Sequence, residues 1–196
     1  MSASAPRALL LASASPRRAD LLRALGVPFA VRASDVDETP RPGESPGSLA
    51  ERLARAKAGA ATPSTTPSLV LAADTVVIVD GQVLGKPSGR EDAVRMLRRL
   101  AGRGHEVITA VALRAVPEET VVVERALSRV TFASMSPEEA EWYAATGEGL
   151  DKAGAYALQG KGALFVTGIE GSYTNVIGLP LERLYPHLRR FGLLPD

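Results

Sequence analysis

The stretch 8–25 combines small hydroxyl and basic side chains where a strand gives way to a helix. A short apolar run predicts a buried strand, Ser15 is placed as an N-cap before Pro16, and the helix then opens with Arg17 and Arg18. The start of a helix already carries partial positive charge, so arginines are unfavourable there unless an anion binds. The pattern favours a phosphate-binding turn, which also involves Ser13; a solvated arginine pair on an ordinary helix is the alternative.

A carboxylate interrupts the most apolar segment of the chain. Residues 69–79 predict a strand buried on both faces, broken only by Asp74 and Thr75. Burying an unpaired carboxylate costs several kcal/mol. Asp74 is therefore expected to be paired, to bind a metal or to face a cleft at a strand end, with a purely structural role as the alternative.

A lysine is expected near this aspartate. The pair Asp80-Gly81 between apolar runs predicts a two-residue hairpin in which Val79 faces Gln82. Counting outward along that hairpin places Lys86 opposite Thr75, which is the neighbour of Asp74. A plain ion pair is one interpretation and a functional site is the other.

A second lysine occupies the apolar side of a predicted helix. Ser45-Pro46 opens this helix, which runs to about residue 61, and Lys57 falls in register with Leu49 and Leu53. Such a lysine needs a partner, unless it extends to solvent at the C-terminal end of the helix. Upstream, the acidic turn 35–39 contains Glu38; it suggests either a metal ligand or a solvated loop.

A glycine-rich polar loop, 157–162, carries Gln159 and is expected between short strands. Glycine is used where backbone must approach a ligand closely. Residues 163–169 and 173–177 are predicted to form a hairpin around Glu170-Gly171.

The remaining predicted elements complete an alternation of strands and helices. Ser88 and Glu91, and likewise Ser136 and Glu139, form predicted capping boxes, and His105 is assigned a hydrogen-bonded structural role. The predicted strands are 29–33, 105–113 and 121–133, and the predicted helices are 88–100, 136–146 and 180–191.

Length and composition limit the classes of protein. The chain has 196 residues, 45% of them hydrophobic and 23% charged, and it predicts a single domain over 1–196. A formal net charge of +1 gives no reason to bind nucleic acid or a membrane surface. The chain has no cysteine, which fits a reducing cytoplasm. Taken together, several cations and two carboxylates favour metal-dependent hydrolysis of a phosphoanhydride.

The ordered motifs of this chain resemble those of the Maf family of nucleoside triphosphate pyrophosphatases, historically associated with septum formation. The matching motifs are Leu-Ala-Ser-Ala-Ser-Pro-Arg-Arg at 11–18, Asp-Val-Asp-Glu-Thr at 35–39, Leu-Ala-Arg-Ala-Lys at 53–57, Ala-Asp-Thr-Val-Val at 73–77, Leu-Gly-Lys-Pro at 84–87, Asp-Lys-Ala-Gly-Ala-Tyr at 151–156 and Gln-Gly-Lys-Gly-Ala at 159–163. The resemblance implies an elongated α/β fold of the Maf and ITPase-like kind. A central mixed sheet flanked by helices would form two lobes around a cleft, usually in a homodimer.

The resemblance also implies a reaction and its residues. A nucleoside triphosphate would be hydrolysed between its α and β phosphates with Mg²⁺ or Mn²⁺, giving monophosphate and pyrophosphate. Asp74 would activate the water, and Glu38 and Asp74 would hold the metal. The residues expected to contact the phosphates are Ser13, Arg18, Lys57 and Lys86.

Three positions resemble the subfamily that acts on dTTP and UTP, namely Arg17, Thr75 and Gln159. The subfamily acting on 7-methyl-GTP has an aromatic residue, a glutamine and a glutamate there. An alternative from a different class is a non-catalytic, nucleotide-sensing regulator of septum formation and cell division. Nucleic-acid binding is a third, which the near-neutral charge disfavours.

Overall fold

A computed structural model describes residues 7–66 and 68–195. The chain forms two compact units that alternate along the sequence. Unit 1 consists of Met1–Asp74, Thr109–Ala126 and Gly178–Asp196, and unit 2 consists of Thr75–Ile108 and Leu127–Ile177. Each unit is described separately.

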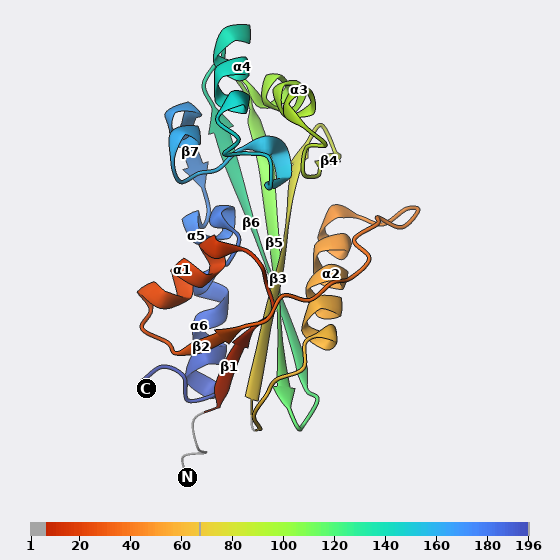
Figure 1. The fold of residues 1–196 in the computed structure, drawn as a ribbon, viewed down its shortest axis with the longest axis vertical. Helices are drawn as coiled ribbons and strands as arrows, with labels where there is room; N and C mark the ends of the chain where they lie inside the picture. Colours follow the sequence, from red (N-terminus) through yellow and green to blue (C-terminus); the bar gives the residue numbers. More distant parts are fainter. Residues whose placement is uncertain (1–6, 67, 196) are drawn as a thin grey trace. The chain divides into compact units, whose positions relative to one another are not determined.

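The described residues form a seven-stranded mixed sheet (Figure 1). Its order is β2-β1-β3-β5-β6-β7, with β4 paired to β3. Strand β1 runs parallel to β2 and β3, whereas β3–β4 and β6–β7 are antiparallel, so the predicted mixed sheet is confirmed. The strands are β1 Ala8–Leu11, β2 Phe29–Val31, β3 Ser68–Val79, β4 Gln82–Leu84, β5 Gly104–Val116, β6 Val121–Phe132 and β7 Val166–Glu170.

The helices follow in chain order between these strands. They are α1 Pro16–Ala24, α2 Pro46–Ala60, α3 Arg90–Leu100, α4 Pro137–Ala145, α5 Tyr173–Ile177 and α6 Leu181–Arg190, with 3₁₀ turns η1 Ala153–Ala155 and η2 Lys161–Phe165. No helix among these residues is long and apolar enough to cross a membrane.

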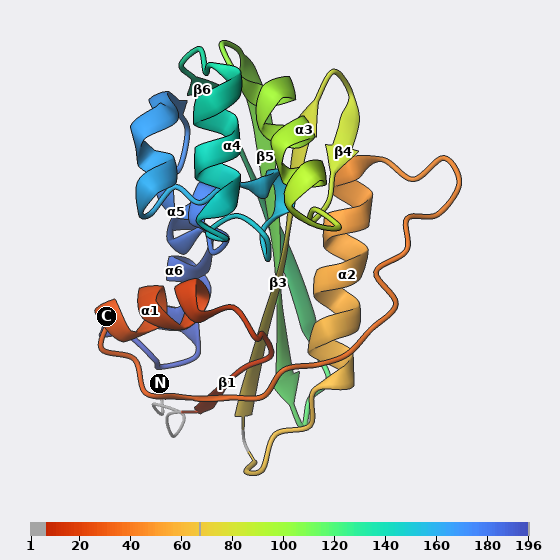
Figure 2. The same cartoon turned by 45° about the horizontal axis from the view of Figure 1, so that its top comes forward.

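The core of unit 1 is built on alternating residues of its strands. Leu9 and Leu11 of β1 and Leu71 of β3 point to one face, where they join Leu22 of α1 and Leu184 of α6. Figures 1 and 2 show α1 and α6 on one side of these strands and α2 on the other. Strand β3 is therefore buried on both faces, as its largely apolar composition predicts.

Unit 2 has its own core beneath α3 and α4, which pack together. Within it, His105 is 2% exposed and its Nε2 lies 2.8 Å from the Tyr156 hydroxyl, while Phe132 meets both rings edge to face. Burial lowers the pKa of His105 to about 4, so the imidazole is neutral at physiological pH. The structural role predicted for His105 is confirmed.

Several local signals place the elements where the sequence predicts them. The Ser45 side chain accepts the backbone N–H of Ser48, and Ser136 forms a complete capping box at the start of α4. Asp80 and Gly81 both have positive φ, as the predicted hairpin turn requires, and Val79 pairs with Gln82.

One predicted capping box is wrong, and one predicted N-cap is right in position only. Ser88 does not form a capping box with Glu91: Gly89 is the N-cap of α3, and the Asp92 carboxylate accepts the Ser88 N–H and hydroxyl instead. Ser15 occupies the N-cap position of α1, but its side chain caps nothing.

The predicted hairpin of 163–169 with 173–177 is also wrong, since Tyr173–Ile177 is helix α5. The Ser172 hydroxyl accepts the Asn175 N–H, which favours a helical turn, and β7 pairs with β6 instead. Buried Asn175 donates to Val107 O at 3.0 Å and Ser128 Oγ at 2.8 Å, which fixes the turn. The glycine-rich loop lies between η1 and η2 rather than between strands.

Candidate active site

The predicted site residues belong to both units. Unit 1 carries Ser13, Arg17, Arg18, Glu38, Lys57 and Asp74, whereas unit 2 carries Thr75, Lys86 and Gln159. The boundary falls between Asp74 and Thr75, in the middle of β3.

In unit 1, Lys57 bridges the two predicted metal ligands. Its Nζ lies 2.6 Å from Asp74 Oδ1 and 2.6 Å from Glu38 Oε1. The side chains of Lys57 and Asp74 are only 12% and 10% exposed, while that of Glu38 is 48% exposed. Lys57 thus pairs with one buried and one exposed carboxylate, and the alternative that it merely extends to solvent is wrong. The structure brings together three residues that the sequence separates by up to 36 positions.

Burial and charge act in opposite directions on Asp74. Loss of hydration raises its pKa, and the positive charges of Lys57 and Arg18 lower it; burial dominates, so the pKa lies above its usual value. A carboxylate with raised proton affinity is a better proton acceptor near neutral pH than an exposed one. The arrangement can therefore support general-base chemistry.

The turn between β1 and α1 fixes a hydroxyl against a guanidinium. Ser13 is 6% exposed, and its Oγ accepts from Arg18 Nη1 at 3.0 Å and from the Ser15 N–H at 3.2 Å. Arg18 Nε donates to Gly178 O at 2.8 Å. Because Ser13 Oγ accepts both bonds, its own hydrogen is directed elsewhere and can be donated to a ligand oxygen.

Arg18 remains a cation despite its burial. Burial lowers its pKa to about 10, against the opposite effect of the Asp74 carboxylate. Arg17 and Arg18 are both half-buried, and on a helix neighbouring side chains point about 100° apart. The two arginines of the predicted phosphate-binding turn are therefore expected to face different directions, and their separate roles stay predictions.

An arginine that the sequence analysis missed holds the acidic turn. Arg52 of α2 donates to both carboxylate oxygens of Glu44, at 2.7 and 2.8 Å, and to Thr39 O at 3.0 Å. The hydrogen bonds from Arg52 lower the pKa of Glu44 to about 2. Thr39 directly follows Glu38, so this clamp ties the turn to the helix that carries Lys57. The spacing of Glu44 and Arg52, eight residues apart across a helix start, gave no recognisable signal.

Arg114 of β5 holds the other end of α2 and was also missed. It donates to Ala58 O at 3.0 Å and to Ala61 O at 2.5 Å, and it contacts Glu119. These carbonyls belong to the last turn of the helix, which has no further helical N–H groups to pair with. Lys57 precedes Ala58, so its backbone is fixed by this contact.

The unit 2 residues are placed on the surface of that unit. Thr75 is half-buried on β3, and Lys86 lies two residues beyond the end of β4, with an exposed side chain. The β3–β4 ladder ends at the pair Val77–Leu84, so the predicted pairing of Lys86 with Thr75 is wrong. Gln159 is exposed in its loop. Whether Lys86 acts together with Asp74 stays a prediction.

The donor set in unit 1 fits a hard divalent cation only when other ligands join it. No group of three or more metal-ligating side chains occurs in the described part of the chain. Glu38 and Asp74 supply carboxylate oxygens, and Mg²⁺ is typically bound by one or two carboxylates together with water and substrate phosphates. The two carboxylates therefore fit a metal that arrives with a polyphosphate.

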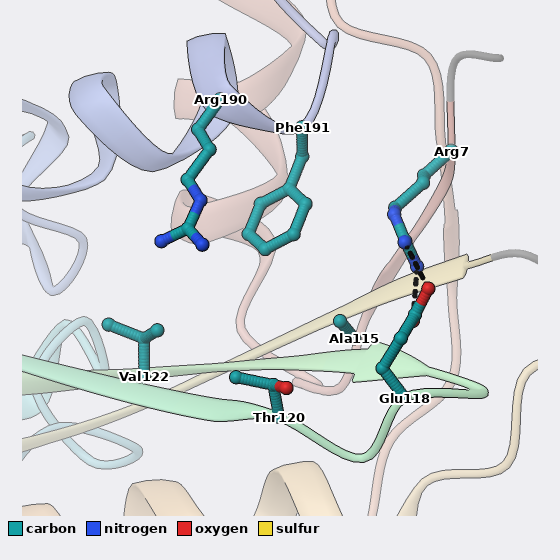
Figure 3. A pocket seen from close by; sticks show the side chains of 7 residues that line it. All are labelled: Arg7, Ala115, Glu118, Thr120, Val122, Arg190 and Phe191. Atoms are coloured by element: carbon teal, nitrogen blue, oxygen red, sulfur yellow. Dashed lines mark hydrogen bonds and ion pairs between the residues drawn. The ribbon is translucent and has the colours of Figure 1, made fainter. Parts of the chain in front are cut away.

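A pocket elsewhere in unit 1 contains none of these residues (Figure 3). Its volume is about 190 Å³, and Phe191 and Arg190 lie across from the strand residues that form its floor. Arg7 is held by Glu118, with contacts of 2.6 and 2.8 Å. The Arg7 guanidinium is already paired with Glu118, and no predicted site residue lines the pocket. We therefore do not assign this pocket to the candidate active site.

Known proteins match nearly the whole chain. The family model described as "Maf-like protein" matches residues 8–191. A protein of Symbiobacterium thermophilum named "dTTP/UTP pyrophosphatase" is 50% identical over 184 residues, covering 94% of each chain. A protein of Myxococcus xanthus with the same name is 52% identical over 185 residues, covering 94% of this chain and 93% of the relative.

Proposed function

Because this chain belongs to the Maf family, we propose that it is a pyrophosphatase that hydrolyses dTTP and UTP to the monophosphate and pyrophosphate. The observation that carries the proposal is the buried Asp74 carboxylate, paired with Lys57 and joined through it to Glu38. Relatives about 50% identical over almost their full length support the choice of substrate.

In the proposed reaction Asp74 accepts a proton from a water molecule. The oxygen of that water forms a bond to the α-phosphorus, and the bond from this phosphorus to the α–β bridging oxygen breaks. The electron pair leaves with pyrophosphate. The raised pKa of Asp74 brings the proton affinity of the base closer to working pH, which favours proton transfer.

The cations of the site are proposed to bind the phosphates. Arg18 and Lys57 offer fixed positive charge in unit 1, and Ser13 offers a hydroxyl donor. Lys86 is assigned the same task from unit 2. In the free protein Lys57 pairs with both carboxylates, and bound phosphates give it an alternative anionic partner. These contacts offset the charge that develops on the leaving pyrophosphate.

We assign Glu38 and Asp74 as the side chains that would hold Mg²⁺ or Mn²⁺ with the substrate. When bound, such an ion neutralises phosphate oxygens and supports attack at phosphorus. Arg17, Thr75 and Gln159 are proposed to select the base. The Gln159 amide has both a donor and an acceptor, which suits the edge of uracil or thymine.

A nucleotide panel tests the function. The purified protein is incubated with dTTP, UTP, CTP and 7-methyl-GTP, with Mg²⁺, with Mn²⁺ or with a chelator, and the products are separated. Monophosphate and pyrophosphate from dTTP and UTP are expected, with 7-methyl-GTP a poor substrate. Tight nucleotide binding without any product would instead support the regulator of cell division.

We further propose that the whole chain works as one domain, in a cytoplasmic homodimer. The supporting arguments are that the family match spans both units and that the resemblance to the Maf family implies a homodimer. Light scattering on the purified protein measures the molar mass, and a monomer would contradict the homodimer.

A further inference from the structure

The loop that carries Gln159 has little regular structure of its own. It runs from Ala157, shortly after η1, to Gly162 in the first residues of η2, and Gln159 is exposed at its middle. A side chain that selects a base by hydrogen bonding must hold its amide in a defined direction. Something outside the loop must therefore fix its backbone.

Glu148, just beyond α4, supplies that constraint. Its Oε2 accepts the Lys161 N–H at 3.0 Å, and its Oε1 accepts the Gly162 N–H at 3.0 Å. Oε1 also accepts the Tyr143 hydroxyl at 2.8 Å. Burial raises the pKa of Glu148, but these donors outweigh it and the pKa lies below its usual value. Glu148 is therefore ionised, and both of its oxygens are used to hold the loop.

Tyr143 extends the same constraint to the start of the loop. Its ring is fully buried, and its hydroxyl, while donating to Glu148, accepts the Ala157 N–H at 3.0 Å. One pair of side chains thus holds Ala157 on one side of Gln159 and Gly162 on the other. Only one residue on either side, Leu158 or Gly160, separates Gln159 from a fixed backbone N–H.

The glycines of the loop serve this contact. A Cβ on Gly160 would lie 2.7 Å from Glu148 Oε2, and one on Gly162 would lie 2.2 Å from Ala157 O and 2.7 Å from Tyr143 Oη. The close approach that the sequence assigned to a ligand is made by the protein's own residues. The loop is packed against Glu148 and Tyr143 before any nucleotide binds.

We propose that Glu148, acting with Tyr143, is a positioning residue that fixes the direction of the Gln159 amide and so determines the preference for uracil-type bases. The inference rests on the proposed function in taking a pyrimidine nucleoside triphosphate as the ligand. A site with an oriented donor and acceptor rejects a base whose edge has donor and acceptor exchanged. An amide that is free to rotate loses that discrimination.

UTP and CTP are the probes, because they share ribose and triphosphate and differ only at the base edge. Dissociation constants are measured by calorimetry in protein that carries Asp74→Asn, so that turnover does not interfere. Glu148→Gln puts an amide NH₂ against backbone donors, which leaves an N–H unpaired. The preference for UTP over CTP is expected to fall about five- to tenfold, through weaker UTP binding.

Three further variants make the test decisive. Tyr143→Phe should lower the preference in the same direction, and it carries the test if Glu148→Gln does not fold. Glu148→Gln combined with Gln159→Ala should have the preference of Gln159→Ala alone, because Glu148 acts through Gln159. Glu141→Gln is the matched control on α4, since Glu141 is exposed and pairs only with Arg90 among the contacts described.

An unchanged preference for UTP over CTP in both Glu148→Gln and Tyr143→Phe would overturn the inference. Equal weakening of UTP and CTP binding would also overturn it. So would a double variant in which the effects of Glu148→Gln and Gln159→Ala on the base preference add. The proposed function fails separately: if the unaltered protein releases no pyrophosphate while Glu148→Gln still shifts the binding preference, the positioning role stands and the hydrolase does not.

Discussion

The Lys57 ammonium nitrogen lies 2.6 Å from an Asp74 carboxylate oxygen, and each side chain is about one-tenth exposed. Helix α2 presents the lysine on its apolar side, and β3 presents the aspartate in a strand that is otherwise apolar. Each charge is costly to bury alone, and each offsets the cost of the other. The pair is also where the proposed base and a proposed phosphate ligand meet.

Asp74→Asn should remove the proposed general base while keeping the side-chain volume. The rate of pyrophosphate release from dTTP is expected to fall by about 10²–10⁴. The melting temperature should change little, because the amide oxygen still accepts from Lys57. Asp20→Asn, which changes an exposed carboxylate on α1 that pairs with Arg23, is the control and should keep full activity. Normal turnover by Asp74→Asn would remove Asp74 from the role of base.

Lys57→Met should leave Asp74 buried without its closest cation. We expect a loss of about 2–4 kcal/mol in the free energy of unfolding, measured by urea denaturation. Adding Asp74→Asn should recover most of that stability but no activity, because the buried charge is gone and the chemistry is not restored. A double variant as unstable as Lys57→Met would show that lost packing, not the unpaired carboxylate, sets the cost.

Arg114→Lys should weaken the end of α2, since a lysine cannot reach two carbonyls and a carboxylate with one planar group. The expected loss of unfolding free energy is about 1–3 kcal/mol, because the Ala58 and Ala61 carbonyls lose their donor. Arg55→Lys, an exposed position on the same helix, is the control and should be neutral. Equal stability of the two variants would refute the capping role.

His105 predicts a pH dependence of stability. Its pKa is about 4 in the folded protein and 6.5 ordinarily, so between these values the unfolded chain binds a proton that the folded one does not. The unfolding free energy should therefore fall as pH drops from 6.5 towards 4, by at most about 1.4 kcal/mol per pH unit from this group. Denaturation at pH 7, 6 and 5 measures the slope.

His105→Gln keeps a partner for the Tyr156 hydroxyl and has no titrating ring. Its unfolding free energy should fall less steeply over the same pH range than that of the unaltered protein. Parallel slopes for the two proteins would show that His105 makes no contribution to acid sensitivity.

Much of the fold follows from local patterns, because helix starts and tight turns depend on neighbouring residues. Pro46 and Pro137, each after a capping serine, mark helix starts, and Asp80-Gly81 marks a hairpin. Residues 173–177 show where such patterns fail. A short apolar run fits either a strand or a helix, and the choice depends on the Ser172 cap and on the pairing of β7 with β6.

The candidate site divides in the same way. The sequence by itself determined that Asp74 and Lys57 are charges in apolar surroundings, because strand and helix periodicity is a property of adjacent residues. Only the tertiary structure decided which residues meet across the site. It places Glu38 beside Lys57, Arg52 against the acidic turn, and Glu148 against the loop that carries Gln159. Those contacts join separate elements, and their distances depend on how the chain packs within each unit, which local periodicity does not encode.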